Sequence, residues 1–228
     1  MEKSFVKDIF DWDVGNWSKS LSFWNKHFPL SEDTKLNCLE LGCNKGGLSL
    51  WLAVKGNQVI CSDYENPEHL AKQLHQNYIA ESKVQYQQID ALNIPYENTF
   101  DLIIFKSIVG GISRNEQHDK KKKVFNEIYK ALKPGGTLLF AENLSGSFIH
   151  KFFRRKFVSW GKDWNYLSIE ELPELCSEFS TVEYTTCGFF GLFGRTEGQR
   201  NFLSKIDSVI EPILPDSAKY IAIAVLKK

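Results

Sequence analysis

The chain of 228 residues is organised around the stretch LELGCNKGGL at positions 39–48. An apolar run precedes this stretch and an amphipathic segment follows it, which is the order strand, glycine turn, helix. Glycine has no Cβ, so the backbone of such a turn can approach a ligand closely. The helix that follows begins with backbone N–H groups that have no partner within the helix. We therefore expect the turn to hold a ligand.

Apolar runs and helical patterns alternate on both sides of this turn. Strands are predicted at residues 36–41, 58–63, 84–90, 100–105, 137–141, 181–189 and 219–226. Helices are predicted at residues 16–28, 48–54, 67–80, 116–132, 168–179 and 199–210, and the residues before 16 are expected to be irregular. This alternation predicts an α/β fold with a mainly parallel sheet and helices on both faces. No repeat or low-complexity linker divides the chain, so we expect a single domain over residues 1–228.

An aromatic face marks the first predicted helix, which Asn16 caps. Trp17, Leu21, Trp24 and Phe28 follow helical spacing there. We expect this N-terminal helical cap, within residues 1–35, to pack on the main domain, and a lid over a substrate pocket is the alternative. Aromatic residues make up 14% of the whole chain, and we favour a bulky core over exposed ligand surfaces as their use.

The carboxyl ends of parallel strands meet at one edge of a sheet, where ligands bind. Asp63 ends the second predicted strand, about 20 residues beyond the turn. Dinucleotide enzymes and S-adenosylmethionine enzymes both place an acid there, which accepts hydrogen bonds from ribose hydroxyls. The glycines Gly42, Gly46 and Gly47 do not form the G-x-G-x-x-G pattern of a dinucleotide site. This spacing argues against an NAD-dependent oxidoreductase, which we keep as the less favoured alternative.

The segment from Glu40 to Gly46 resembles the first motif of the class I S-adenosylmethionine-dependent methyltransferases, an acid followed by three glycines at alternate positions. Asn44 replaces the middle glycine, and asparagine tolerates left-handed backbone better than most residues. FDLII at residues 100–104 matches the fourth strand of that family, and LKPGGTL at residues 132–138 is typical of its turn into the fifth. A looser likeness, in residues 160–166 and the C-terminal tail, is to methyltransferases of bacterial polysaccharide gene clusters.

The resemblance implies a Rossmann-like sheet of seven strands in the order 3-2-1-4-5-7-6, with the last strand antiparallel, and S-adenosylmethionine as the cofactor. It implies that Asp63 binds the ribose, that Tyr64 lies beside the adenine and that Asp90, in the pair Asp90-Ala91, meets the adenine amino group. Lys106-Ser107 ends the fourth strand, where the family holds the methionine part of the cofactor. The predicted cofactor-binding residues are Glu40, Gly42, Cys43, Asn44, Gly46, Asp63, Tyr64, Asp90, Ala91, Lys106 and Ser107.

Methyl transfer from a sulfonium requires the donor and the acceptor to be aligned, and a hydroxyl acceptor also needs a general base. The candidate catalytic bases are Glu142, at the end of the fifth strand, and His150, in a basic segment. His118 is a third candidate, and each histidine has a structural or surface role as its alternative. We expect methylation of an O or N atom of a small or carrier-linked acceptor, such as a sugar or an anionic metabolite. A non-catalytic S-adenosylmethionine-binding regulatory module is the alternative from another class.

The variable region at residues 144–200 is where we expect the acceptor to bind. Its first part is basic and aromatic, and Arg154, Arg155, Trp160 and Trp164 are the candidate substrate-binding residues. Arginine pairs with phosphate through two hydrogen bonds, so Arg154-Arg155-Lys156 is a candidate clamp for an anionic acceptor. A solvated basic face is the simpler alternative. Insertion of the interleaved aromatic side chains into an anionic membrane surface is another.

The formal net charge is zero, which provides no overall attraction for nucleic acid, so no nucleic-acid partner is expected. The five cysteines show neither a Cys-x-x-Cys pair nor zinc-site spacing, and no metal site is predicted. No apolar run approaches the ~20 residues of a membrane span, and no signal peptide is visible. These features lead us to expect a cytoplasmic protein with reduced cysteines, and the sequence does not indicate an oligomeric state.

Overall fold

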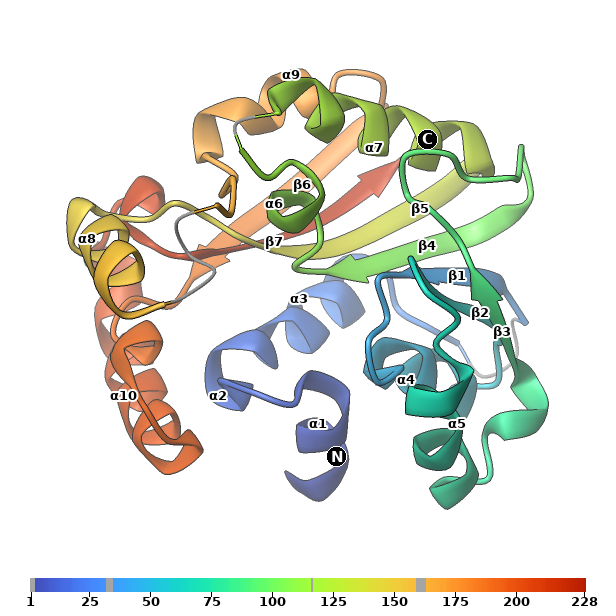
Figure 1. The fold of residues 1–228 in the computed structure, drawn as a ribbon, viewed down its shortest axis with the longest axis horizontal. Coiled ribbons are helices and arrows are strands. Elements are labelled where there is room, and N and C mark those ends of the chain that lie inside the picture. The colour runs from blue at the N-terminus through green and yellow to red at the C-terminus, as the bar shows by residue number, and fades with distance from the viewer. Residues whose placement is uncertain (1–2, 32–34, 116, 159–162) are drawn as a thin grey trace.

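The computed structural model describes residues 3–31, 35–115, 117–158 and 163–228. A seven-stranded sheet in the order β3-β2-β1-β4-β5-β7-β6 forms its centre (Figure 1). The strands are β1 (Asn37–Leu41), β2 (Gln58–Asp63), β3 (Val84–Gln88), β4 (Phe100–Lys106), β5 (Leu132–Asn143), β6 (Thr181–Cys187) and β7 (Ile221–Lys227). β1 to β5 pair in parallel, and β7 runs antiparallel to β5 and β6. The predicted order and the antiparallel last strand are confirmed.

Helices cover both faces of the sheet (Figure 1). One face carries α1 (Lys3–Phe10), α2 (Val14–Trp17), α3 (Lys19–His27), α4 (Gly47–Val54) and α5 (Glu68–Asn77), and their buried side chains form one core cluster with Trp17, Trp24 and Trp51. The other face carries α6 (Val109–Ile112), α7 (His118–Ala131) and α9 (Leu172–Leu175). Phe105 and Phe140 stack in that second core, with ring centroids 5.2 Å apart.

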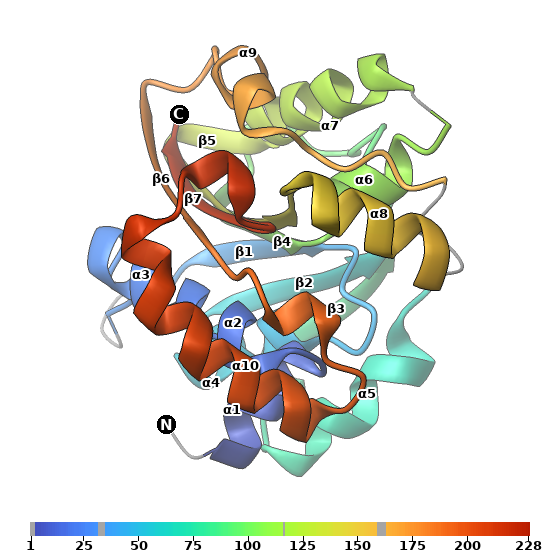
Figure 2. The same cartoon turned by 90° about the vertical axis from the view of Figure 1, so that its left-hand side faces the viewer.

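Two helices, α8 (Phe148–Phe157) and α10 (Glu197–Ile210), lie beside the end of the sheet where the parallel strands finish (Figures 1 and 2). α8 follows β5 after a short connection, and α10 precedes β7. The region that the sequence marked as basic and aromatic therefore contributes a helix to the edge at which ligands of this fold class bind.

The N-terminal segment differs from its sequence-based prediction. Residues 3–10, expected to be irregular, form α1, and the single helix predicted from Asn16 is two helices. Asn16 lies inside α2 instead of capping it, and its side-chain amide donates to Asp207 Oδ2 and to the Tyr220 hydroxyl, both at 2.9 Å. Long-range hydrogen bonds to α10 and to Tyr220, which precedes β7, therefore override the local capping preference of asparagine. Trp17, Leu21 and Trp24 of the predicted aromatic face are buried, whereas Phe28 follows the end of α3 and is half-buried.

Two other boundaries also differ. The helix predicted at residues 168–179 is a 3₁₀ turn at Ile169–Glu171 followed by the single turn of α9, although the capping box between Ser168 and Glu171 is present as expected. β5 begins at Leu132, so the LKPGG segment belongs to the strand and does not only lead into it. Three further 3₁₀ turns, at Gly191–Phe193, Glu211–Ile213 and Asp216–Ala218, surround α10, and another at Glu81–Lys83 precedes β3.

Candidate active site

The glycine turn between β1 and α4 has left-handed backbone at every second residue. The φ angles are +63° at Gly42, +49° at Asn44 and +75° at Gly46. Most L-residues lose about 1–2 kcal/mol in this region, whereas glycine adopts it freely and asparagine visits it routinely. The geometry explains why glycine suits all three positions, and why Asn44 preserves the turn.

Two acids anchor this turn. The buried carboxylate of Glu40 accepts hydrogen bonds from the backbone N–H of Ser49, at 2.7 Å, and from the Ser49 hydroxyl, so it ties the end of β1 to the first turn of α4. Burial raises the pKa of Glu40 to about 7. Asp63, at the end of β2, accepts the N–H of Asn44 on Oδ2 at 2.8 Å and the N–H of Tyr64 on Oδ1 at 2.7 Å. Each oxygen of Asp63 retains acceptor capacity for a ligand hydroxyl.

His75, which the sequence analysis did not identify, contacts the glycine turn at Gly46. Its Nε2 lies 2.9 Å from the carbonyl oxygen of Gly46, and its Nδ1 lies 2.8 Å from the Tyr86 hydroxyl. Burial lowers the pKa of His75, so the neutral ring is favoured. A Cβ at position 46 would lie 2.7 Å from this ring, so the close packing of α5 also selects glycine there.

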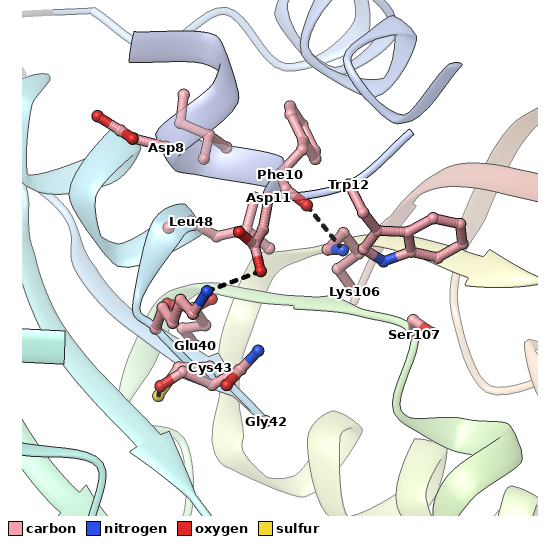
Figure 3. A pocket seen from close by; sticks show the side chains of 14 residues that line it. Asp8, Phe10, Asp11, Trp12, Glu40, Gly42, Cys43, Leu48, Lys106 and Ser107 are labelled. Atoms are coloured by element: carbon pink, nitrogen blue, oxygen red, sulfur yellow. Dashed lines mark hydrogen bonds and ion pairs between the residues drawn. The ribbon is translucent and has the colours of Figure 1, made fainter. Parts of the chain in front are cut away.

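A cavity of about 200 Å³ opens at the carboxyl ends of β1 and β4 (Figure 3). Glu40 and the turn residues Gly42, Cys43 and Asn44 line one side, and Lys106 and Ser107 line another. The third side is the N-terminal segment 8–12, which was missed by the sequence analysis. Lys45 Nζ and Asp11 Oδ2 form an ion pair of 3.0 Å between the turn and this segment (Figure 3).

Lys106 extends from the end of β4 into this site. Its Nζ lies 4.8 Å from the ring centroid of Trp17 and 5.9 Å from that of Trp12, and it donates to the carbonyl oxygen of Phe10 at 3.4 Å. Within the described part of the chain, no ion pair joins Lys106 to a carboxylate. Burial lowers the pKa of Lys106 to about 8, while Asp11 and Glu40 act in the opposite direction.

The base candidates lie away from the cavity wall. Glu142 is fully buried, and its carboxylate accepts the backbone N–H groups of Ile108, Val109 and Asn143 at 2.8–2.9 Å. Burial raises the pKa of Glu142 to about 7. These hydrogen bonds fix the connection from β4 into α6, so the geometry gives Glu142 a positioning role.

His150 is also fully buried, with Nε2 2.8 Å from the carbonyl oxygen of Phe189 and Nδ1 3.1 Å from the Ser147 hydroxyl. Burial lowers its pKa. His118 is exposed, 3.6 Å from Glu171. None of the three side chains lines the cavity.

Gly46 does not line the cavity, and four other predicted cofactor residues also lie outside it, at the ends of β2 and β3. Asp63 is half-buried, and Tyr64 is exposed. Asp90 is exposed and accepts the N–H of Leu92 at 2.9 Å, and Ala91 is buried. They flank the glycine turn on the side opposite Lys106, because β2 and β3 lie on the other side of β1 from β4. Ser107, within the cavity wall, has φ of +58° and accepts a hydrogen bond from the Asn143 amide on its hydroxyl oxygen.

The predicted substrate residues separate into different environments. Arg155 is exposed, Trp164 is half-buried against Gly110 and Gly111 of α6, and Trp160 lies outside the described residues. Gly110 permits the contact with Trp164, since a Cβ there would lie 2.0 Å from the indole nitrogen. Arg154, in contrast, is 2% exposed on the inner side of α8. The structure therefore does not bring Arg154 and Arg155 together in one clamp.

The guanidinium of Arg154 is a buried cation that forms no ion pair with the described residues. Nη1 donates to the carbonyl oxygens of Leu144 at 2.6 Å and Ser145 at 3.2 Å, and Cζ lies 3.9 Å from the ring centroid of Tyr166. Among the residues that the structure describes, Nη2 has no acceptor, and the Tyr166 hydroxyl and the Asn165 amide nitrogen have no partner; all three atoms are buried. Burial lowers the pKa of Arg154 to about 10. A buried cation without a carboxylate is costly, and an anionic ligand would compensate it.

Comparisons with known proteins agree with this geometry. The family model described as a methyltransferase domain matches residues 39–140, which include the glycine turn, Asp63, Asp90 and Lys106. No curated protein matches the chain. No helix in the described ranges has the length and apolar character needed to cross a membrane.

Solved structures share the fold at low sequence identity. Phosphoethanolamine N-methyltransferase 2 of Haemonchus contortus, in complex with phosphomonomethylethanolamine and S-adenosylhomocysteine, has a TM-score of 0.64 and 20% identity over 93% of this chain. The match spans 52% of that enzyme, so the chain has about half its length. N-methyltransferase NodS of Bradyrhizobium japonicum, with S-adenosylhomocysteine, has a TM-score of 0.58 and 17% identity, over 92% of this chain and 86% of NodS.

The [4+2]-cyclase SpnF also has this fold, with a TM-score of 0.60 and 16% identity over 92% of this chain and 80% of its own. The fold alone therefore does not decide the reaction. The family model, which matches residues 39–140, provides sequence evidence for a methyltransferase domain in addition to the strand order. Residues 39–140 therefore match a methyltransferase domain in sequence, and they lie in a sheet with the strand order predicted for the class I S-adenosylmethionine-dependent methyltransferases.

Proposed function

We propose that the chain transfers the methyl group of S-adenosylmethionine to an N or O atom of a small or carrier-linked acceptor that bears a phosphate or a carboxylate. The observation that carries this proposal is the buried guanidinium of Arg154, whose Nη2 has no acceptor. A guanidinium binds phosphate and carboxylate through two parallel hydrogen bonds. The phosphomonomethylethanolamine bound by the Haemonchus contortus enzyme supports the proposal, because that acceptor combines an amine with a phosphate.

The residues at the glycine turn fit the cofactor. The three left-handed positions hold the backbone of Gly42, Asn44 and Gly46 in the turn, while Asp63 offers its remaining lone pairs to the ribose hydroxyls. Tyr64 and Asp90 would hold the adenine, and Lys106 and Ser107 would hold the methionine part. The cofactor supplies a methyl group on a sulfonium, which is already activated for transfer.

Lys106 is the proposed proton acceptor, in place of the base candidates from the sequence. It lines the cavity, whereas the carboxylate of Glu142 and both ring nitrogens of His150 are engaged in buried hydrogen bonds. The neutral amine of Lys106 takes the proton that the acceptor loses. The faces of Trp12 and Trp17 and the carbonyl oxygen of Phe10 then stabilise the ammonium that forms.

Radiolabelled methyl transfer to matched pairs of acceptors tests the proposal. Each pair differs only in the anionic group: phosphoethanolamine against ethanolamine, a sugar phosphate against the free sugar, and glycine against glycinamide. We expect the anionic member of a pair to be methylated, and Arg154→Met to raise its KM by about 10–100-fold, the value of a charge-assisted hydrogen bond. Arg195→Met, which removes an exposed arginine from a loop, is the matched control and should leave KM unchanged.

Equal methylation of both members of each pair would contradict the role of Arg154, as would an unchanged KM in Arg154→Met. Binding of S-adenosylhomocysteine without methyl transfer to any acceptor would instead favour a non-catalytic cofactor-binding module.

A further inference from the structure

We propose that the outer face of α8 docks on a membrane surface that contains anionic lipids. This outer face consists of Phe148, Ile149, Lys151, Phe152, Arg155 and Lys156, all of which are exposed. The proposal concerns a surface distinct from the cavity and does not depend on the methyl-transfer reaction.

Large apolar side chains lie at the centre of this face. Phe148 is 79% exposed, Phe152 is 58% exposed, and the two are four residues apart, so they lie one above the other on the helix. Ile149 adds a third apolar side chain that is 42% exposed. His150 and Arg154 occupy the opposite side of the helix and are buried against the domain. The helix is therefore anchored by its inner side while its apolar outer side faces solvent.

Cations flank the exposed phenylalanines. Lys151 and Arg155 are four residues apart on one flank, and Lys156 lies on the other with its Nζ 5.1 Å from the ring centroid of Phe152. The sequence of α8, FIHKFFRRKF, contains no acid. A shallow surface hollow is lined by Phe148, Phe152 and the three cations. Since the whole chain has a formal net charge of zero, this face attracts anions locally and not through an overall positive charge.

These features favour an anionic lipid surface over other partners. Cations in the last turn of a helix stabilise its dipole, but this effect does not account for the exposed phenylalanines. A nucleic acid would use the cations and leave the apolar side chains without a role, and it would require a broader basic surface. Lipid uses both groups, because phenylalanine enters the boundary of the acyl chains while lysine and arginine pair with the headgroups.

The position of α8 gives such docking a consequence. The helix lies at the edge of the sheet where the parallel strands finish (Figures 1 and 2). Arg154 projects from the inner side of the same helix, so the headgroups would lie about one helix diameter, ~10 Å, from that guanidinium. On the proposed role of Arg154, an acceptor held at the membrane by a lipid anchor would thus be delivered beside that guanidinium.

Cosedimentation of the full chain with vesicles tests the proposal. The vesicles are phosphatidylcholine alone, or phosphatidylcholine with phosphatidylglycerol, at an ionic strength of about 0.15 M. We expect binding to the anionic vesicles only. The variants Phe148→Ser/Phe152→Ser and Lys151→Glu/Arg155→Glu/Lys156→Glu should each weaken this binding at least about tenfold.

The matched controls are Ile79→Asn, which removes an isoleucine that is 93% exposed beyond α5, and Lys123→Glu/Lys130→Glu on α7. α5 lies far from α8 in the fold (Figure 1). Both control variants should bind the anionic vesicles as the unaltered chain does. Titration with S-adenosylhomocysteine shows whether each variant is folded.

A second measurement reports on insertion directly. The five native cysteines are buried, so Phe152→Cys permits selective labelling with an environment-sensitive fluorophore. Its emission should shift to the blue with anionic vesicles, whereas the same label at Ile79→Cys should not respond.

Absence of binding to anionic vesicles would overturn the proposal. So would binding that the charge variant abolishes and the phenylalanine variant retains, since that result indicates a merely basic face. Self-association that the phenylalanine variant abolishes, without vesicle binding, would assign the face to a second copy of the chain and would equally overturn it.

Discussion

Replacing Arg154 by methionine removes a buried charge that has no carboxylate partner in the described part of the chain. Burial lowers the pKa of Arg154 from 12.5 to about 10, and at ~1.4 kcal/mol per pKa unit this fall corresponds to roughly 3 kcal/mol that disfavours the charged side chain in the fold. The substitution also removes the charge-assisted hydrogen bonds to Leu144 and Ser145, roughly 1.5–3 kcal/mol each. The two effects oppose each other, so we expect the free energy of unfolding to fall by no more than about 3 kcal/mol.

Urea denaturation and ligand-dependent melting provide the assay. A ligand at 100 times its Kd stabilises a folded chain by about 2.7 kcal/mol, so an anionic acceptor that is methylated in the matched-pair assay should raise the melting temperature of the unaltered chain. This acceptor should not raise the melting temperature of Arg154→Met, while S-adenosylhomocysteine should stabilise both chains equally. A loss of more than about 3 kcal/mol in urea, with the anionic acceptor still stabilising the variant, would refute the reasoning and make Arg154 a structural residue.

Three further perturbations have defined outcomes. Burial lowers the pKa of Lys106 to about 8, so kcat should rise with pH up to that value and then level off. The side chain in Lys106→Arg stays protonated, so this variant should lose turnover while it still binds S-adenosylhomocysteine. An unchanged pH–rate profile in this variant would exclude Lys106 as the base. Asp63→Ala should weaken S-adenosylhomocysteine binding by about 1–3 kcal/mol in calorimetry, and an unchanged affinity would remove the ribose role. Ile79 is 93% exposed and has left-handed backbone with φ of +56°, which strains a β-branched residue but not glycine. Ile79→Gly should therefore raise the free energy of unfolding in urea by about 0.5–1 kcal/mol. A lower free energy of unfolding would contradict the backbone strain at this position.

The sequence was sufficient to predict the sheet and the glycine turn between β1 and α4. The spacing of Gly42, Asn44 and Gly46 reflects a local backbone requirement, which is why the left-handed geometry could be anticipated from three residues. The strand order followed from a family likeness, and the alternation of strands and helices supported it.

The remaining features depend on contacts between distant segments. The carbonyl oxygen of Ile9 lies so close to α4 that a Cβ on Gly47 would be 2.2 Å from it, and nothing in the local pattern of residues 3–12 predicted that contact. Glu142 was expected at the active edge, but the backbone N–H groups of the β4–α6 connection engage its carboxylate. Arg154 and Arg155 were grouped because they are adjacent, whereas the helical period of α8 places them on different sides. The helical period of residues 148–157 could have predicted from the sequence that Arg154 and Arg155 face different sides.

Binding of S-adenosylhomocysteine at the glycine turn is tested most directly by isothermal titration calorimetry on the unaltered chain, Asn44→Gly and Asn44→Val. Glycine keeps the left-handed turn, whereas the β-branched valine loses about 1–2 kcal/mol in that conformation. We expect the unaltered chain and Asn44→Gly to bind with similar affinity, and Asn44→Val to bind at least about tenfold more weakly. No heat of binding to the folded, unaltered chain at millimolar S-adenosylhomocysteine would contradict the assignment of this turn as the cofactor site.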